Sequence, residues 1–437
     1  MKTFQKRIVV LLIALAILCS LIGCAQKPAS NSDKTPTAEP SSTENKEPAA
    51  DASPENAADA QTTDTAETFS IGISVSYSGA TAQYGLEEIN GLEMELDYIN
   101  SNGGFNGAKG VMATLYDSKG STEEAVKSAQ KLTQNEDCDA IIASQVSSEV
   151  LASGNVYNDA KIFTIGMGTS ATWMQQGWEY LIRGSVNYDF VAPNAVAMMS
   201  EMGISSIAMM FDQSEASISF KDTVVALCEE AGIDIIITES CEVEDTDMTA
   251  QCTRIINAKP QAVFCSMSGN DIGYFVKQMR QYGYTGIFFD KESYYAAAVE
   301  IAGQENSNYI FFANPYVTYA KLEDCDIPNM TEFLEDYVER YGVLPSTEIA
   351  YRAWDSTMVI WEATKLSGSN ETEDMLAVVD QIVIEGLGGT MDYTNGDGEP
   401  YHNVRKFVYV NGLNVDWQTW MENGGYDEYK AATGNEY

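Results

Sequence analysis

The stretch FSIGISVSYSGATAQYGLEEINGLEMELDYINSNGGF, residues 69–105, decides the fold class. Its first seven residues alternate apolar with small polar side chains, which predicts a strand over 69–75 with one apolar face. Apolar residues then recur at every third or fourth position from Leu86 to Ile99, and this spacing places them on one face of a helix. The glycines at 103 and 104 end that helix. The chain therefore begins with a strand followed by an amphipathic helix.

The same unit recurs along the chain. Strands joined by helices of this length form parallel sheets that are covered on both faces. The alternation falls into two runs of about 120 residues each, the size of an ordinary folding unit, so we predict an α/β protein with two doubly wound lobes. Helix then dominates 330–366. The expected strands are 69–75, 111–116, 140–144, 162–167 and 180–183 in the first run, 207–211, 233–238, 262–266, 287–289 and 309–312 in the second, and a last strand at 406–411.

The N-terminus has the pattern of an export signal. Three basic residues precede an apolar run over 8–22, which is shorter than the ~20 residues of a membrane-spanning helix. The run ends in Leu21-Ile22-Gly23-Cys24, which resembles the bacterial lipobox, where the peptide is cut before a cysteine that then carries lipid. An ordinary signal peptide that happens to contain a cysteine is the alternative. The lipobox predicts a lipoprotein signal peptide over 1–23 and a lipid on Cys24.

The next segment, 25–67, differs in composition from the rest of the chain. It is rich in Ala, Pro, Ser, Thr, Asp and Glu and contains no aromatic residue, Val, Ile or Leu. Such a segment cannot bury enough apolar surface to offset its ordering entropy. We therefore predict that 24–67 is a lipidated cysteine followed by a disordered tether with a reach of about 35–40 Å. The domain that follows would be held at the extracytoplasmic face of the cell membrane.

Charge and composition exclude several classes of function. The chain has 25 Lys and Arg against 64 Asp and Glu, a formal net charge of −39. A chain this acidic repels phosphate backbones, so we expect no nucleic-acid partner. A single histidine leaves too few imidazoles for most zinc sites and catalytic triads, and no phosphate loop or G-x-S-x-G motif is present. We expect no enzyme activity, no cofactor and no metal.

Three smaller features of the sequence each allow more than one structural interpretation. His402 lies between Tyr401 and Asn403, and we expect a surface hairpin residue. Residues 392–399 contain half of a calcium-loop pattern, but Asn-Gly and Asp-Gly pairs mark turns, so a turn is favoured over a metal site. Disulfides are permitted after export and buried free thiols are also common, so the pairing stays open for the cysteines after Cys24. These are Cys138, Cys228, Cys241, Cys252, Cys265 and Cys325.

Polar loops follow the predicted strands in both lobes. Open parallel sheets bind ligands at the carboxyl ends of their strands, so two facing lobes would form a cleft lined by these loops. Short polar side chains beside helix N-termini suit a small ligand with an anionic group, although any one loop could be an ordinary cap or turn. The loops are 76–85, 144–149 and 167–171 in the first lobe and 212–217, 267–270 and 290–293 in the second.

Several segments together carry a family pattern. The most specific part combines YSGATAQYG at 77–85, Asn90-Gly91 and YINSNGGFNG at 98–107. Tyr116-Asp117 before a Thr-Glu-Glu-Ala-Val helix, TIGMGT at 164–169 and LIR at 181–183 continue it. These segments resemble the branched-chain amino acid-binding proteins of ABC transporters, and the resemblance covers about 69–411. It implies the type I periplasmic binding protein fold, in which two Rossmann-like lobes joined by three crossings close on a ligand by hinge motion. The implied lobes are 68–186 plus 315–405 and 187–314 plus 406–437.

The resemblance also implies which residues contact a ligand. Tyr84 matches the tyrosine of the first loop, and a serine-rich loop that holds the ligand carboxylate matches residues 145–148, with Gln145 and Ser147. Gly168 and Thr169 match the small residue and the threonine after the fourth strand. In lobe two, Glu292 matches the acid that binds the ligand ammonium. Asp212 and Gly269 mark two loops in which the family has tyrosines, whereas this chain has Ala216 in one and Gly269 or Ser268 in the other. The half of the site that reads the side chain therefore differs, and leucine is not implied.

The sequence is compatible with two functions. The first is a solute-binding lipoprotein that captures an amino acid or related carboxylate and delivers it to an ABC permease. The second is a sensing module of the same fold that reports its ligand to a membrane receptor. The chain has no signalling segment after the lobes, which favours import. The sequence does not determine the ligand or the oligomeric state.

Overall fold

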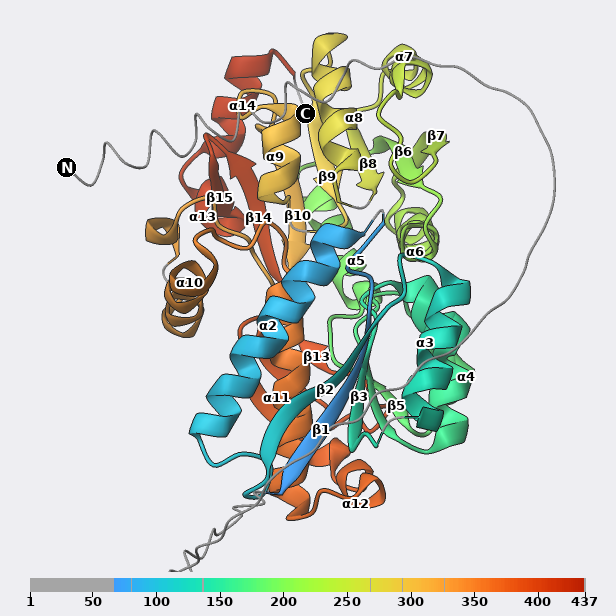
Figure 1. Cartoon of the computed structure of the whole chain (residues 1–437). Coiled ribbons are helices and arrows are strands. Elements are labelled where there is room, and N and C mark those ends of the chain that lie inside the picture. The colour runs from blue at the N-terminus through green and yellow to red at the C-terminus, as the bar shows by residue number, and fades with distance from the viewer. Residues whose placement is uncertain are drawn as a thin grey trace, which may run out of the picture. The chain divides into compact units, whose positions relative to one another are not determined.

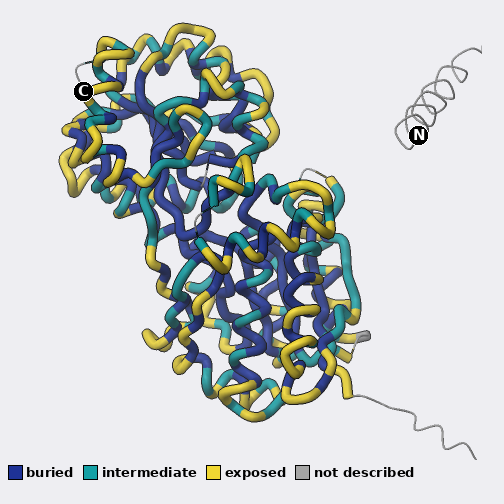
Figure 2. Tube along the Cα trace, turned by 90° about the vertical axis from the view of Figure 1, so that its left-hand side faces the viewer, coloured by how far each residue is buried: buried dark blue, intermediate teal, exposed yellow. Residues whose placement is uncertain are grey.

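The computed structural model describes residues 67–79, 81–135, 137–267, 269–292, 294–325 and 327–435. The predicted signal peptide, Cys24 and the predicted tether up to residue 66 lie outside the described residues. Within these ranges the chain forms two open α/β sheets and one small antiparallel sheet (Figure 1). Buried residues fill the space between the sheets and their helices, and exposed residues follow the outer turns (Figure 2).

The first sheet is parallel and five-stranded. Its elements are β1 (Thr68–Val75), α2 (Ala82–Ser101), β2 (Lys109–Asp117), α3 (Thr122–Asn135), β3 (Ala140–Ala143), α4 (Ser147–Ala160), β4 (Phe163–Gly166), η1 (Met174–Gln176) and β5 (Leu181–Arg183). The strand order is β2-β1-β3-β4-β5. Phe69, Ile71 and Ile73 pack on Leu92 and Ile99 in one buried core, so the periodicity of the opening stretch is confirmed. In Figure 1, α2 covers one face of this sheet, and α3 and α4 cover the other.

The second sheet has seven strands, in the order β15-β14-β10-β9-β8-β6-β7. Its elements are α5 (Tyr188–Glu201), β6 (Ser206–Asp212), α6 (Glu215–Ala231), β7 (Asp234–Cys241), α7 (Thr249–Ala258), β8 (Ala262–Ser266), α8 (Asp271–Gln281), β9 (Ile287–Asp290), α9 (Ala296–Ala302), β10 (Ile310–Asn314), β14 (Arg405–Val410), β15 (Leu413–Asp416), α13 (Trp417–Glu422) and α14 (Gly425–Thr433). Strands β6 to β10 are parallel, as predicted. The strand pattern at 406–411 becomes β14, which pairs antiparallel with β10, and β15 adds an edge strand that the sequence did not predict.

The segment between the two parts of the second sheet differs from prediction. Its elements are η2 (Leu322–Asp324), α10 (Pro328–Tyr341), α11 (Ile349–Ser367), α12 (Thr372–Leu376), η3 (Val379–Gln381), β11 (Val383–Gly386), β12 (Gly389–Asp392) and β13 (Tyr401–His402). The predicted helical stretch over 330–366 is two helices, because Gly342 ends α10 in a left-handed conformation with φ +77°. The small antiparallel sheet β11-β12-β13 was not predicted, and the turn expected near 392–399 joins its last two strands.

The chain crosses between the two large sheets three times. The crossings follow β5, β10 and β13, and they make the predicted fold of two doubly wound lobes. Helix α11 returns to the first lobe and lies against α2, where a Cβ at Gly91 would come within 2.2 Å of the Ala350 carbonyl oxygen. Glycine at position 91 therefore permits this close approach. We propose lobe boundaries at 68–186 plus 315–405 and at 187–314 plus 406–437.

Among the cysteines that the structure describes, Cys228, Cys241, Cys252, Cys265 and Cys325 are free thiols. Three of them, Cys241, Cys252 and Cys265, lie together in the apolar core of the second lobe. Among the described residues, no three His, Cys, Asp or Glu side chains are grouped to hold a metal ion. In this lobe the sulfurs therefore serve as core packing.

His402 is not the surface residue that the sequence predicted. It lies in β13, is fully buried, and its ring is 6.0 Å from that of Tyr316. Burial and the positive charges of Arg183 and Arg352 lower the pKa of His402 to about 3. Its neighbours Tyr401 and Asn403 are exposed, as the sequence suggested, but successive residues of a strand face opposite sides and the His402 side chain faces inward. A neutral imidazole is thus buried beside two arginines.

The pH dependence of stability should report this burial. An unfolded histidine has a pKa near 6.5, so below that pH the unfolded chain takes up a proton that the folded chain does not. The stability that neutral His402 contributes is therefore present above pH 6.5 and is lost as the pH falls toward 3. Between pH 7 and 5 the expected loss is about 2 kcal/mol. Urea denaturation of the wild type and His402→Gln at both pH values isolates this loss, because the carboxylates titrate in both proteins. Equal pH dependence in the two proteins would contradict the buried neutral form.

Candidate functional site

Two loops of the first lobe lie in contact at the carboxyl ends of β3 and β4. The backbone N–H of Ser170 donates a 3.2 Å hydrogen bond to the Ser147 Oγ. A Cβ on Gly168 would lie 2.9 Å from the Cα of Ser147, so the loops can touch only because position 168 has no side chain. Thr169 is buried between these contacts, and the buried Gln145 Nε2 has no hydrogen-bond partner. The structure thus brings together the four lobe-one loop residues that the sequence predicted.

Arg183 holds the loop after β4 through hydrogen bonds to its backbone. It is fully buried at the end of β5, and its guanidinium donates to the carbonyl oxygens of Gly168 and of Ser170, the latter at 2.7 Å. The guanidinium also lies 4.2 Å from the Trp173 ring centroid and 3.5 Å from a Glu399 oxygen. Both carbonyls that flank Thr169 therefore point toward Arg183.

In the second lobe, Glu292 belongs to a buried group of charges. The Lys291 Nζ donates to the Ser217 Oγ at 2.7 Å and lies 3.3 Å from a Glu292 oxygen. Burial acts to raise the pKa of Asp212, but the charge of Lys291 and hydrogen bonds from Ser214 and Ser217 outweigh it and hold that pKa below its ordinary value. Two carboxylates therefore share one ammonium. The formal charge of Asp212, Lys291 and Glu292 together is −1. Two more buried acids, Asp271 and Asp290, act on the same charges, and burial raises the pKa of each above its ordinary value.

The lobes meet where Tyr84 faces Gly269. A Cβ on Gly269 would lie 2.3 Å from the Tyr84 hydroxyl oxygen, so the loop after β8 approaches α2 closely. This hydroxyl is buried without a hydrogen-bond partner. Burial raises the pKa of Tyr84 well above its ordinary value, and the negative charge of Glu292 raises it further. Tyr84 and Glu292, from opposite lobes, thus lie within electrostatic range. Ser268 and Ser293 lie outside the described residues.

Four further residues join this site that the sequence reasoning missed. The backbone N–H of Tyr188 donates to the Thr169 carbonyl oxygen at 3.1 Å, and the Tyr295 hydroxyl donates to Glu292 at 2.6 Å. From α11, Arg352 donates to the Tyr188 hydroxyl at 2.9 Å and to Glu348. The only signal in the sequence was the i,i+4 spacing of Glu348 and Arg352 at the start of α11. All four residues lie outside the loops in which ligand contacts were predicted.

A sequence model of the periplasmic binding protein family matches residues 68–412. The chain belongs to this family. Its members are solute-binding proteins rather than enzymes. In the described part of this periplasmic binding protein, no helix combines the length and the apolar character that crossing a bilayer requires.

Curated relatives of this periplasmic binding protein are named for amino acids. The Leu/Ile/Val-binding protein homolog 8 of Brucella melitensis is 23% identical over 357 residues, 78% of this chain and 86% of that protein. The leucine-, isoleucine-, valine-, threonine- and alanine-binding protein of Pseudomonas aeruginosa is 24% identical over 229 residues, 52% of this chain and 61% of that protein. The chain therefore spans less than two thirds of the length of the Pseudomonas protein.

Solved structures show the same fold. The branched-chain amino acid transporter substrate-binding protein LivJ of Streptococcus pneumoniae, in complex with isoleucine, has a TM-score of 0.69 at 21% identity and covers 80% of this chain and 100% of its own. A solute-binding protein of R. palustris in complex with benzoate has a TM-score of 0.71 at 17% identity, over 80% and 95% of the two chains. The predicted two-lobed fold and the resemblance to the branched-chain amino acid type are confirmed.

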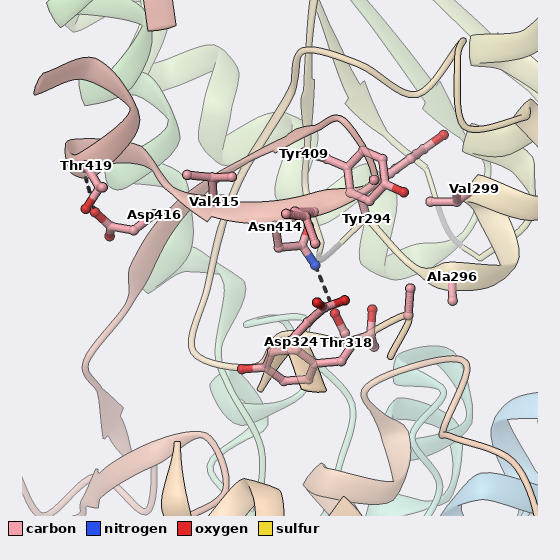
Figure 3. Close-up of a pocket in the computed structure, with 14 residues that line it drawn as sticks. Tyr294, Ala296, Val299, Thr318, Asp324, Tyr409, Asn414, Val415, Asp416 and Thr419 are labelled. Atoms are coloured by element: carbon pink, nitrogen blue, oxygen red, sulfur yellow. Dashed lines mark hydrogen bonds between the residues drawn. The ribbon is translucent and has the colours of Figure 1, made fainter. Parts of the chain in front are cut away.

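Two hollows of this periplasmic binding protein lie apart from the predicted residues. The first has a volume of about 440 Å³ and lies on the second lobe between β15, α9 and the segment after β10. Across this hollow the Asn414 side chain donates a 2.9 Å hydrogen bond to the Thr318 carbonyl oxygen (Figure 3). The other, of about 350 Å³, lies between Trp178 and Asp380 in the first lobe. None of the ligand-contact residues implied by the sequence lines either hollow.

Proposed function

We propose that the protein is an extracytoplasmic solute-binding lipoprotein, anchored through Cys24, that captures an amino acid or related carboxylate between its lobes and delivers it to an ABC importer. The observation that carries this proposal is the arrangement of Asp212, Lys291 and Glu292. A buried excess of one negative charge is costly unless it is compensated. The ammonium of an amino acid would supply the missing positive charge.

The first lobe supports the other half of an amino acid. Helix α4 begins at Ser147 after Val146, whose side chain cannot accept hydrogen bonds from the first N–H groups of the helix. Those N–H groups and the Gln145 Nε2 are donors that a carboxylate would satisfy. Thr169 lies beside them, with its loop held by Arg183. In this proposal, Tyr84, Gln145, Ser147, Gly168, Thr169, Asp212, Gly269 and Glu292 contact or border the ligand.

The names of the relatives support the amino-acid class, since several are named for leucine, isoleucine and valine. One structural neighbour holds benzoate, which has a carboxylate and no amine. The ligand class is therefore the point to test first.

A thermal-shift screen of the purified protein against amino acids, short peptides and aromatic acids tests the proposal. A ligand at 1,000 times its Kd stabilises by about 4 kcal/mol, which is a large shift in Tm. We expect a shift with at least one amino acid. A shift with aromatic acids alone would mean that the ligand is a carboxylate without an amine. If no small molecule shifts the Tm, solute capture is overturned.

The import role and the anchor have separate tests. Deleting the gene should abolish uptake of the labelled ligand; loss of a transcriptional response with uptake intact would instead support the sensing alternative. Cys24→Ser should abolish incorporation of labelled palmitate, and continued incorporation would contradict the lipobox.

A further inference from the structure

Arg352 is a buried arginine that the proposed head-group contacts leave unused. It is 3% exposed and lies one turn after Glu348 in α11. Its Nη2 donates to the Tyr188 hydroxyl at 2.9 Å and to the Glu348 carboxylate, which also accepts from the Asn314 side chain at 3.0 Å. Its Nε–H is buried and has no acceptor. An unpaired buried donor costs about 1–3 kcal/mol, so this N–H favours an incoming oxygen.

Hydrogen bonds place Arg352 next to the proposed head-group contacts. Tyr188, which it contacts, donates its own backbone N–H to the Thr169 carbonyl oxygen. From the opposite lobe, Tyr295 donates to Glu292 at 2.6 Å. Burial raises the pKa of Tyr295 well above its ordinary value, and the charges of Glu292 and Glu348 both raise it further. Arg352, Tyr188 and Tyr295 therefore adjoin the proposed head-group contacts Thr169 and Glu292, and the inference places the ligand side chain at this end of the site.

The charge of this end is balanced. Glu348 already neutralises Arg352, and both are buried. A ligand side chain with a full negative charge would upset this pair and would face Glu292 as well. An aliphatic side chain would leave both the Arg352 Nε–H and the Tyr84 hydroxyl without partners. A neutral side chain that carries oxygen avoids both costs, and an amide offers an acceptor and a donor together.

We infer that Arg352 reads the ligand side chain and that this protein prefers amino acids with a neutral, oxygen-bearing side chain, best an amide, over leucine, isoleucine and valine. This inference rests on the proposed function. It differs from the leucine, isoleucine and valine for which several relatives are named.

Isothermal titration of the unaltered protein with glutamine, asparagine, glutamate, leucine and valine tests the preference without any variant. We expect an amide amino acid to bind about 100-fold more tightly than leucine or valine, because the aliphatic ligands leave two buried polar groups unpaired. Tighter binding of leucine or valine, or of glutamate, would overturn the inference and leave the proposed function standing. Binding of none of these amino acids would overturn the inference, and only the absence of any ligand in the thermal-shift screen would overturn the proposed function as well.

Arg352→Lys tests the residue itself. Lysine keeps the positive charge beside Glu348 but has no Nε–H in the arginine position. We expect the affinity for the amide ligand to fall about tenfold or more while the affinity for leucine changes less than threefold. Arg340→Lys, at an exposed ion pair with Asp97, is the matched control and should change neither affinity. An equal loss for both ligands would mean that Arg352 only supports the fold, which would overturn its role as a reader.

Discussion

Replacing Glu292 by glutamine should weaken the binding of an amino acid by roughly 30- to 4,000-fold. Glutamine keeps the shape of the side chain and removes its charge, so the ligand ammonium would be buried without its counter-charge. The free protein should lose no stability. Lys291 still donates to Ser217 and still interacts with the charge of Asp212, and the net charge of Asp212, Lys291 and residue 292 changes from −1 to 0. Isothermal titration gives the affinity, and thermal denaturation gives the Tm of the free protein.

Two companion variants sharpen this test. Glu242→Gln removes the same charge from an exposed position of the same lobe and should leave the affinity within threefold. Thr169→Val should weaken any carboxylate ligand, with or without an amine. A loss with Thr169→Val but not with Glu292→Gln would identify a carboxylic acid that lacks an amine. If both changes leave the best ligand within threefold, the proposed site is misplaced.

The strand and helix pattern was predictable because it is local. Every strand expected from 69–75 to 309–312 is present, since each is a short apolar run between turns and each pairs in parallel. The small sheet β11-β12-β13 was missed because its strands, VIEG, GTMD and YH, mix apolar residues with glycine and polar residues and lack the apolar runs of the predicted strands. The break at Gly342 was missed because apolar spacing continues through both α10 and α11.

The candidate site also contains residues that were predicted from the sequence and residues that were missed. Ser147, Thr169 and Glu292 were predicted from the family resemblance, and they follow β3, β4 and β9 at the carboxyl ends of these strands. Arg352 and Tyr188 were missed because tertiary packing alone brings α11 and the first crossing to these strand ends. His402 shows the same limit, since its sequence neighbours are polar whereas its spatial neighbours are the Tyr316 ring and two arginines. Such placements depend on how the crossings pack, which no local pattern reports.

Replacing Arg183 by methionine should destabilise the protein by about 3–5 kcal/mol, the usual cost of removing one partner of a buried ion pair. The change leaves the buried Glu399 without its cation and frees the carbonyl oxygens of Gly168 and Ser170. Because those carbonyls flank Thr169, the affinity for a carboxylate ligand should fall too. Urea denaturation at pH 7 and isothermal titration measure the two effects.

Arg254→Met is the matched control for Arg183→Met. The pair shows whether burial or the length of the hydrogen bonds decides the stability cost of losing an arginine. Arg254 holds Glu239 through two contacts of 2.6 Å, which is closer than the 3.5 Å between Arg183 and Glu399. Its side chain is 53% exposed, however, so water replaces the lost contacts and Arg254→Met should destabilise the protein far less than Arg183→Met. Adding Glu399→Gln to Arg183→Met should recover part of the stability, because the unpaired buried charge is then removed. Equal costs for Arg183→Met and Arg254→Met would mean that Arg183 does not hold the loop that carries Thr169.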